Sequence, residues 1–339
     1  MTKHPTTKRI VLCYPVEPKH IEQIGAAAPD AEIINAGQER IAEEIFSADV
    51  FCGHAKAPID WDGVVRQGRL QWIQSSAAGM DHCLVPSVIE SDVVVTSASG
   101  VLSDQVAEHA IALVTGWCRS LLTFFRAQQK KEFTRRPTRD LTRGTVGIVG
   151  LGGVGRRLAA LLSAFEARIL ATDMFPIDKP ACVEALWPAD RLEDLLAAVD
   201  ILILCLPLNG STRGMINAPM LAKMRPGSLL VNVARGPLVV TTDLVESLGS
   251  GHLAGAVMDV TDPEPLPPEN RLWDFPNVII TPHVGGQSAW RIDNITRLFC
   301  RNLRRRQAGL PLVNYLSDKR LGFPIRGGGY PLWGEPCEP

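Results

Sequence analysis

Residues 145–173, TVGIVGLGGVGRRLAALLSAFEARILATD, contain the pattern that decides the fold. An apolar run leads into Gly150, Gly152 and Gly155, which have the spacing G-x-G-x-x-G, and an amphipathic stretch and a second apolar run ending at Asp173 follow. In such a strand–turn–helix unit the first glycine permits a tight turn and the second lets a pyrophosphate approach the backbone. The third lets the helix pack close to the strand. The pattern predicts a Rossmann-type dinucleotide-binding domain.

The acidic residue at the end of this unit bears on the choice of dinucleotide. Asp173 stands eighteen residues after Gly155, where a carboxylate can accept hydrogen bonds from the hydroxyls of the adenine ribose. Its charge repels a 2′-phosphate, and Met174 follows where an NADP enzyme often has an arginine. NAD is therefore favoured over NADP. Lys179 keeps the alternative open, since its ammonium group lies close enough in the sequence to reach a phosphate.

Short β-branched runs alternate with amphipathic stretches on both sides of this unit. Strands are expected at 9–15, 31–37, 49–55, 70–76, 92–98, 145–150, 168–173, 200–206, 227–233, 254–259 and 277–281. One long helix is expected over 103–130, with Ser103 as its N-cap, and another helix over 288–309. Alternating strands and helices form parallel sheets covered on both faces. The sequence thus predicts an α/β fold with two doubly wound parallel-sheet domains.

The composition narrows the class of protein. Of 339 residues, 46% are hydrophobic and 21% charged, and 35 basic residues against 36 acidic ones give a net charge of −1. No overall field attracts a nucleic acid or an anionic membrane. Eight scattered cysteines form no CxxC pair, so neither a metal site nor a disulfide framework is indicated. We expect a soluble cytoplasmic protein, because no apolar stretch precedes residue 10 to form a signal peptide.

Chemically active side chains follow three later strands of the second half. Open α/β sheets bind ligands beyond the carboxyl ends of their strands, so these side chains are expected to converge near one end of the dinucleotide. The segments are VNVARG (231–236) with Arg235, MDVTDPEPLP (258–267) with Asp259 and Glu264, and ITPHVGG (280–286) with His283.

These segments resemble those of the D-isomer-specific 2-hydroxyacid dehydrogenase family. The resemblance extends from about residue 45 to residue 320, and SSAAGMDH (75–82) and GVLSDQVAEHAIAL (100–113) also carry it. Further similar segments are GIVGLGGVG, DILILCLPLNGSTRGMI, LLVNVARG, GHLAGAVMDVTDPEPLP and TPHVGG. The resemblance implies an NAD-dependent oxidoreductase that interconverts a D-2-hydroxy acid and a 2-oxo acid by hydride transfer.

The residue types suit that reaction. An imidazole exchanges protons near neutrality, so His283 would protonate the carbonyl oxygen, and Glu264 would orient His283 and favour its protonated form. The planar fork of Arg235 can hold a carboxylate and a carbonyl. The resemblance implies that the substrate carboxylate binds backbone N–H groups of Ala77, Ala78 and Gly79, and that Asp259 contacts the nicotinamide carboxamide. It implies cofactor contacts from Gly150, Gly152, Gly153, Val154, Gly155, Asp173, Pro207, Ala234, Asp259 and Gly285.

The family arrangement also implies a domain organisation. The NAD-binding Rossmann domain (102–288) would be inserted into a flavodoxin-like substrate domain formed by residues 1–101 and 289–321. Residues 322–339 form a Gly/Pro-rich tail in which no regular element is expected. The tail is either disordered or packed as an arm on a partner subunit, and the aromatic residues Tyr330 and Trp333 favour the arm. A homodimer is expected from the long apolar helix.

The substrate is left open by the sequence. Glyoxylate or hydroxypyruvate is the first expectation, and a short form of 3-phosphoglycerate dehydrogenase acting on a dianionic substrate is an alternative. In the basic linker 130–143, Arg135, Arg136 or Arg139 either lines the pocket of the partner subunit or belongs to a solvated dimer edge. A non-enzymatic NAD-sensing scaffold of the same fold is a further alternative.

Overall fold

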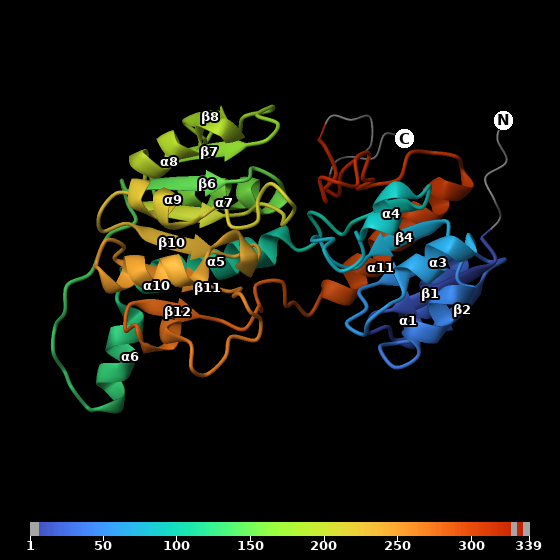
Figure 1. Ribbon diagram of the computed structural model, residues 1–339, viewed down its shortest axis with the longest axis horizontal. Helices are drawn as coiled ribbons and strands as arrows, with labels where there is room; N and C mark the ends of the chain where they lie inside the picture. Colours follow the sequence, from blue (N-terminus) through green and yellow to red (C-terminus); the bar gives the residue numbers. More distant parts are fainter. Residues whose placement is uncertain (1–6, 327–330, 335–339) are drawn as a thin grey trace. The chain divides into compact units, whose positions relative to one another are not determined.

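Two parallel sheets organise the protein, one in each of two units of the chain (Figure 1). Unit 1 comprises Met1–Leu102 and Ser288–Pro339, and unit 2 comprises Ser103–Gln287. The computed structural model describes residues 7–326 and 331–334. All neighbouring strands within these residues run parallel. The predicted α/β class with two doubly wound parallel sheets is therefore confirmed.

Unit 1 has a five-stranded sheet in the order β2-β1-β3-β4-β5. Its elements are β1 (Arg9–Cys13), α1 (Pro18–Ala27), β2 (Glu32–Asn35), α2 (Ile41–Glu44), a 3₁₀ turn (Ile45–Ser47), β3 (Val50–Gly53), α3 (Trp61–Gln67), β4 (Trp72–Ser75), α4 (Pro86–Glu90), β5 (Val94–Thr96) and α11 (Arg291–Gln307). Apolar residues of α1 and α11 pack on one face of the sheet, and those of α2, α3 and α4 on the other. Strands covered on both faces are mostly apolar, and all residues of β3 and β4 except Gln74 and Ser75 are nonpolar.

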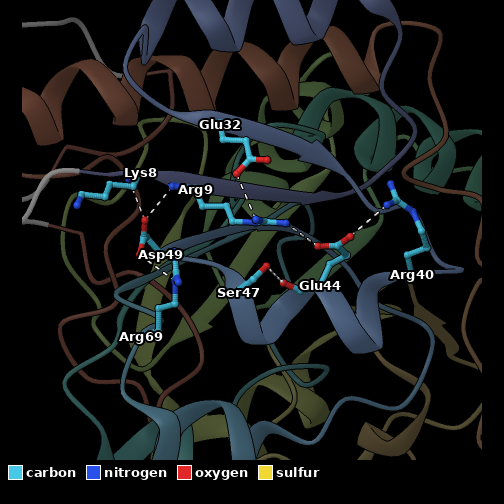
Figure 2. A network of polar contacts seen from close by, with 8 residues as sticks. All are labelled: Lys8, Arg9, Glu32, Arg40, Glu44, Ser47, Asp49 and Arg69. Atoms are coloured by element: carbon cyan, nitrogen blue, oxygen red, sulfur yellow. Dashed lines mark hydrogen bonds and ion pairs between the residues drawn. The ribbon is translucent and has the colours of Figure 1, made fainter.

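A polar network holds the amino-terminal ends of these strands together (Figure 2). The Asp49 carboxylate accepts hydrogen bonds from the backbone N–H groups of Lys8 and Arg9, both at 2.8 Å. The Arg9 guanidinium lies 3.2 Å from Glu32 and 3.0 Å from Glu44. One side chain on β1 is thereby linked to β2 and to α2, which fixes the start of β1.

A second network is buried and connects α11 to the sheet. The Asn302 amide donates to Gln74 Oε1 at 2.8 Å and to Val313 O at 3.0 Å, and its oxygen accepts from Val313 N at 2.7 Å. Thr96 donates to the same Gln74 oxygen and accepts from Trp72 Nε1, each at 2.8 Å. All five residues are fully buried. The network therefore fixes the position of α11 along the strands, which apolar packing alone does not do.

Unit 2 has a seven-stranded sheet in the order β12-β11-β10-β9-β6-β7-β8. Its elements are α5 (Ser103–Cys118), α6 (Leu121–Gln129), β6 (Thr145–Val149), α7 (Gly153–Ser163), β7 (Arg168–Asp173), β8 (Ala185–Pro188), α8 (Leu192–Ala198), β9 (Ile201–Leu204), α9 (Ala218–Lys223), β10 (Leu229–Asn232), α10 (Thr241–Gly249), β11 (Gly255–Met258) and β12 (Val278–Ile280), with 3₁₀ turns at Ala189–Arg191, Gly236–Leu238 and Arg271–Asp274. Helices α5 and α7 pack on one face, and α8, α9 and α10 on the other. β6 lies between β7 and β9, so the strand order reverses there, where open sheets bind ligands.

The prediction of one continuous helix over 103–130 is wrong. α5 ends at Cys118 and α6 begins at Leu121. Between them Ser120 adopts a left-handed conformation with φ of +55°. Arg139 from the following linker donates its backbone N–H to Cys118 O at 2.8 Å, and the Ser120 hydroxyl donates to Pro137 O at 3.0 Å. The linker thus supplies hydrogen bonds that replace those of a continuing helix.

Two smaller expectations also change. Ser103 is the first residue of α5, and its Oγ has no hydrogen-bond partner within the described part of the chain, so the predicted N-cap is wrong. The edge strand β8 was not predicted. Its four residues ALWP end in a proline, which an edge position tolerates because the outer side of the strand donates no ladder hydrogen bond.

The tail residues 331–334 pack on their own unit. Trp333 lies against the apolar core beneath α11, and its N–H donates to Asn314 Oδ1 at 3.1 Å. Asn314 N in turn donates to Pro331 O at 2.9 Å. The expectation that Trp333 reaches a partner subunit is therefore wrong, and Tyr330 lies outside the described residues. As predicted, residues 322–326 and 331–334 contain no helix or strand.

The cysteines behave as core residues. Seven of them lie in the described residues, all unpaired, and five of these are buried. Burial raises the pKa of the Cys13 and Cys300 thiols to about 11 and that of Cys205 to about 12, so these thiols are poor nucleophiles near neutral pH. Residues 7–326 and 331–334 hold no group of three or more His, Cys, Asp or Glu side chains arranged for a metal ion. Nor do they contain a helix long and apolar enough to cross a membrane.

Asn302→Leu is expected to lower the free energy of unfolding by about 3 kcal/mol, because it removes one of the two donors to Gln74 Oε1 and leaves both backbone groups of Val313 buried without their partner. Urea denaturation measures the loss. Arg297→Ala, on an exposed position of the same helix, should cost less than about 0.5 kcal/mol. Equal losses for both variants would contradict the role assigned to the network.

Candidate active site

The predicted site residues of unit 2 follow the carboxyl ends of consecutive strands. In a parallel sheet these ends share one edge, so the side chains line that edge in strand order. From β7 to β12 the residues are Asp173 at the end of β7, Gly150–Gly155 after β6, Pro207 after β9, Arg235 after β10, Asp259 after β11 and His283 after β12.

The glycine loop has the clearances that a dinucleotide requires. A Cβ on Gly150, whose φ is +94°, would lie 2.8 Å from Cys205 O, and one on Gly155 would lie 2.1 Å from Gly150 O. A Cβ on Gly152 would meet no described atom within 4 Å, so the space beside it is open. Two glycines therefore let the loop close on itself, and the third leaves room for a phosphate.

The start of α7 completes this loop. The helix begins at Gly153, and its N-cap Gly152 has no side chain to satisfy the first amides of Gly153, Val154 and Gly155. Unsatisfied N–H groups at a helix N-terminus attract anions. These residues fit a pyrophosphate and would hold that part of a dinucleotide.

Asp173 is fixed by the same loop. Its carboxylate accepts the N–H of Leu151 at 2.6 Å and the N–H of Phe175 at 2.9 Å, one on each oxygen. Each oxygen keeps capacity for a further donor. The carboxylate thus stands at the end of β7 as an oriented acceptor, which suits ribose hydroxyls.

The cationic side chains of Arg156 and Lys179 both donate hydrogen bonds to backbone carbonyl oxygens. The Arg156 guanidinium donates to the carbonyl oxygens of Leu151 at 3.0 Å, Asp178 at 2.7 Å and Ile177 at 3.1 Å. The Lys179 ammonium donates to Val183 O at 2.6 Å. Arg156 therefore joins the glycine loop to the loop after β7, a role that sequence reasoning missed because carbonyl partners leave no residue pattern.

His283 and Glu264 form a hydrogen-bonded pair. His283 Nδ1 lies 2.7 Å from Glu264 Oε1, and because a carboxylate only accepts, Nδ1 donates. Both side chains are 44% exposed, so the second ring nitrogen, Nε2, remains available to a ligand. His283 has a left-handed backbone with φ of +55°, and its N–H donates to Asp259 O at 2.8 Å and Thr281 O at 3.0 Å. The structure brings together the imidazole and carboxylate that the sequence predicted as a pair.

Asp259 organises the turn that carries His283. Its Oδ1 accepts from Thr281 Oγ1 at 2.6 Å and Val284 N at 3.0 Å, and its Oδ2 accepts from Gly285 N at 2.9 Å. Asp259 is 2% exposed. A buried carboxylate with these donors fixes the backbone on both sides of His283.

Arg235 follows β10 in a bend held by Asn232. The Asn232 amide donates to Arg235 O at 2.8 Å, and its oxygen accepts from Ala234 N at 3.1 Å. A Cβ on Gly236 would lie 1.9 Å from Thr261 O, so the segments after β10 and β11 touch backbone to backbone. Sequence reasoning missed Asn232, although a lone amide at the end of an apolar strand was a usable signal.

Comparison with known proteins places this arrangement in a family. A family model described as "D-isomer specific 2-hydroxyacid dehydrogenase, NAD binding domain" matches residues 111–285, just over half of the chain.

The chain belongs to the D-isomer specific 2-hydroxyacid dehydrogenase family.

Individual relatives agree over most of the chain. A glyoxylate reductase of Thermofilum pendens is 32% identical over 277 residues, 78% of this chain and 80% of the relative. A D-isomer specific 2-hydroxyacid dehydrogenase of Xanthobacter autotrophicus Py2, solved with NADPH and MES, superposes with a TM-score of 0.79 at 28% identity, covering 93% of this chain and 99% of the other. An NADPH-dependent glyoxylate/hydroxypyruvate reductase of Sinorhizobium meliloti, solved with NADP and sulfate, gives 0.79 at 27% identity, covering 93% and 100%.

In the present member of the family, the predicted carboxylate-binding loop lies in unit 1 after β4. Ala77 N–H already donates to Ser75 Oγ at 3.0 Å. The N–H groups of Ala78 and Gly79 donate to no acceptor within residues 7–326 and 331–334. Two of the three predicted backbone donors are therefore open to a ligand, and Ala77 serves to shape the loop.

The basic linker divides into two parts. The Arg139 guanidinium donates to Gly227 O at 2.6 Å and lies 5.2 Å from the centre of the Trp117 ring, so Arg139 anchors the linker on its own subunit. Arg135 and Arg136 are exposed, with Arg136 3.7 Å from Glu132. The hypothesis that a linker arginine lines a partner's pocket therefore now concerns Arg135 and Arg136.

Gly152→Ala and Gly155→Ala are expected to separate binding from stability. Gly152→Ala should change the free energy of unfolding by less than about 0.5 kcal/mol and raise the Kd for NADH about tenfold or more, because its methyl group enters open space beside the helix start. Gly155→Ala should cost about 2 kcal/mol or more, because its Cβ would lie against Gly150 O. Denaturant unfolding and NADH fluorescence titration measure the two effects. Wild-type NADH affinity in Gly152→Ala would show that no phosphate approaches this position.

Proposed function

We propose that the protein is an NAD-dependent D-2-hydroxyacid dehydrogenase that reduces glyoxylate, hydroxypyruvate or a related small 2-oxo acid. The observation that carries the proposal is the His283–Glu264 pair at 2.7 Å, on the same sheet edge as a glycine loop fitted to a dinucleotide. A histidine whose Nδ1 is held by a carboxylate presents Nε2 as a proton donor or acceptor.

His283 would handle the proton of the reaction. When bound, the nicotinamide dinucleotide supplies the hydride that adds to the carbonyl carbon of the 2-oxo acid. His283 Nε2 gives its proton to the carbonyl oxygen, and the resulting 2-hydroxy acid carries one added hydride and one added proton. Glu264 stabilises the imidazolium before the transfer through the Nδ1–H hydrogen bond. In the oxidative direction the same nitrogen removes the hydroxyl proton.

Arg235 and the loop after β4 would orient the substrate. A guanidinium offers parallel N–H donors to a carboxylate and a neighbouring carbonyl, and this geometry aligns the carbonyl carbon for attack. Arg235 stands at the end of β10 in a bend fixed by Asn232. The amides of Ala78 and Gly79 would bind the substrate carboxylate. These groups act by positioning, and they leave proton transfer to His283.

The preference for NAD rests on Asp173 and on the orientation of the cations near it. Two backbone N–H groups fix the Asp173 carboxylate as an acceptor, and its negative charge opposes a 2′-phosphate. Arg156 and Lys179 donate to backbone oxygens. The two NADP-bound structural relatives set the opposite precedent, so a direct comparison of cofactors is required.

A homodimer is part of the proposal. No residue of α6 is buried against the described part of the chain, and Leu121 and Phe125 on it are 43% and 57% exposed. Phe133 in the following linker is fully exposed. Large apolar side chains exposed along one segment of the chain are typical of a subunit interface. The cytoplasmic location stays a prediction of the sequence.

Two other functions remain as alternatives. The exposed Arg135 and Arg136 favour a dianionic substrate such as 3-phosphohydroxypyruvate, if the linker reaches a partner's pocket. A non-enzymatic NAD-sensing scaffold would keep the dinucleotide site without turnover.

Loss of NADH absorbance should reveal the substrate. With glyoxylate, hydroxypyruvate, pyruvate, phenylpyruvate and 3-phosphohydroxypyruvate, we expect turnover on at least one of the first two. His283→Ala should lower kcat about 1,000-fold because the proton donor is lost, and Glu264→Gln about 100-fold because the imidazolium loses its counter-charge. His252→Ala is the control, since this imidazole contacts Leu221 O on unit 2. NADH binding with no turnover on any acid would favour the non-enzymatic scaffold. If 3-phosphohydroxypyruvate is the best substrate, the alternative function with a dianionic substrate is favoured.

Cofactor preference should reverse when the charge at the end of β7 is reversed. The wild type is expected to have a kcat/KM at least about tenfold higher with NADH than with NADPH, because the Asp173 carboxylate repels the 2′-phosphate. The double variant Asp173→Ser, Met174→Arg should favour NADPH. Asp178→Ser, which removes a carboxylate from the same loop, serves as the control and should keep the wild-type order. Equal use of both cofactors by the wild type would contradict the assignment.

A further inference from the structure

A histidine outside the predicted site touches the group that organises the His283 turn. His109 lies on α5, and its Nε2 is 3.1 Å from Thr281 Oγ1 and 3.2 Å from Asp259 Oδ1. The Thr281 hydroxyl donates its own proton to the same Asp259 oxygen at 2.6 Å. The hydroxyl and the carboxylate therefore both present lone pairs to His109, so Nε2 carries a proton and donates.

The packing leaves little freedom at this point. A Cβ on Gly285 would lie 2.8 Å from Asp259 Oδ2 and 3.3 Å from His109 Cδ2. The turn backbone at 285 thus sits directly on both side chains. The Asp259 side chain is 3% exposed and that of His109 is 21% exposed, so the hydrogen bonds between them are largely shielded from water. Hydrogen bonds to a buried charged group are stronger than those between neutral groups.

The position of Asp259 along the sheet identifies what the cluster faces. Asp173 at the end of β7 suits the adenine ribose, and the loop after β6 suits the pyrophosphate. β11 lies three strands from β6 in the opposite direction from β7. Along the sheet edge this direction leads away from the adenine ribose and past the pyrophosphate loop, toward the other end of a dinucleotide. Asp259 therefore stands where the nicotinamide end of a dinucleotide would lie.

We propose that His109 is a positioning residue for the nicotinamide end of the cofactor. It acts through Asp259 and Thr281: the Nε2–H donor holds the carboxylate and the hydroxyl in the rotamers that fix the 281–285 turn. The proposal rests on the proposed function, since it assumes that the dinucleotide binds along this edge. It assigns His109 no contact with substrate and no proton transfer.

The test compares two ligands that share all but the nicotinamide. NADH and ADP-ribose both use the glycine loop and Asp173, and only NADH reaches Asp259. His109→Leu is expected to raise the Kd for NADH about tenfold and to change the Kd for ADP-ribose less than about twofold. His109→Gln, whose amide can donate from a similar position, should recover most of the NADH affinity. His252→Leu, which removes an imidazole elsewhere in unit 2, is the matched control. Calorimetric titration measures both ligands without turnover.

The outcomes separate the two proposals. Equal losses for NADH and ADP-ribose without recovery in His109→Gln would show that His109 serves folding only, and unchanged NADH affinity in His109→Leu would also overturn the proposal. A third outcome is that the wild type binds NADH but reduces no 2-oxo acid, while His109→Leu loses NADH affinity and keeps ADP-ribose affinity. This outcome would support the role of His109 and contradict the proposed function. Wild-type protein that binds neither ligand would overturn both.

Discussion

A carboxylate removed from water must be surrounded by hydrogen-bond donors, and at Asp259 this requirement shapes the surrounding structure. The donors come from the Thr281 hydroxyl, two successive backbone N–H groups at 284 and 285, and His109 on a helix far away in the sequence. To bring these N–H groups to one carboxylate the chain must turn sharply after β12. His283 stands inside that turn and adopts the left-handed backbone conformation the turn demands. The direction in which the imidazole leaves the sheet is thus decided by the buried charge beside it.

The same edge of the sheet depends on close backbone approaches that only glycine permits. Gly155 lies against Gly150 O, and Gly236 against Thr261 O, at distances where a Cβ has no room. Gly152 is different, because open space adjoins it. The first kind of glycine brings protein segments together, and the second kind keeps a place for a ligand. This difference explains why one motif contains glycines with unlike consequences for stability and for binding.

Local patterns predicted those parts of the molecule in which neighbouring residues decide the structure. The glycine loop, the position of Asp173 and the parallel α/β fold follow from G-x-G-x-x-G between apolar runs. The His283–Glu264 pair follows from the family resemblance. Contacts across long stretches of chain were missed. The break after Cys118 depends on a hydrogen bond from Arg139, twenty-one residues later, and His109 meets Thr281 172 residues away. A helix-forming sequence carries no sign that a distant linker will bond to its last carbonyl groups. Trp333 was misjudged for the same reason, since its partner Asn314 belongs to the same unit.

The order of charges along the edge of unit 2 connects these features. At the end of β7 the Asp173 carboxylate accepts two backbone N–H groups and keeps capacity for further donors, which favours neutral hydroxyl groups over a phosphate. At β6 the loop presents amides and no acidic side chain, which suits a pyrophosphate. Beyond β10 and β12 come Arg235 and His283, two groups that can carry positive charge toward a small anion. Asp259 and Glu264 are negatively charged. Asp259 is buried among its hydrogen-bond donors, and Glu264 accepts the hydrogen bond from His283 Nδ1. The two negative groups therefore act within the protein: Asp259 fixes the turn around His283, and Glu264 holds the His283 imidazole.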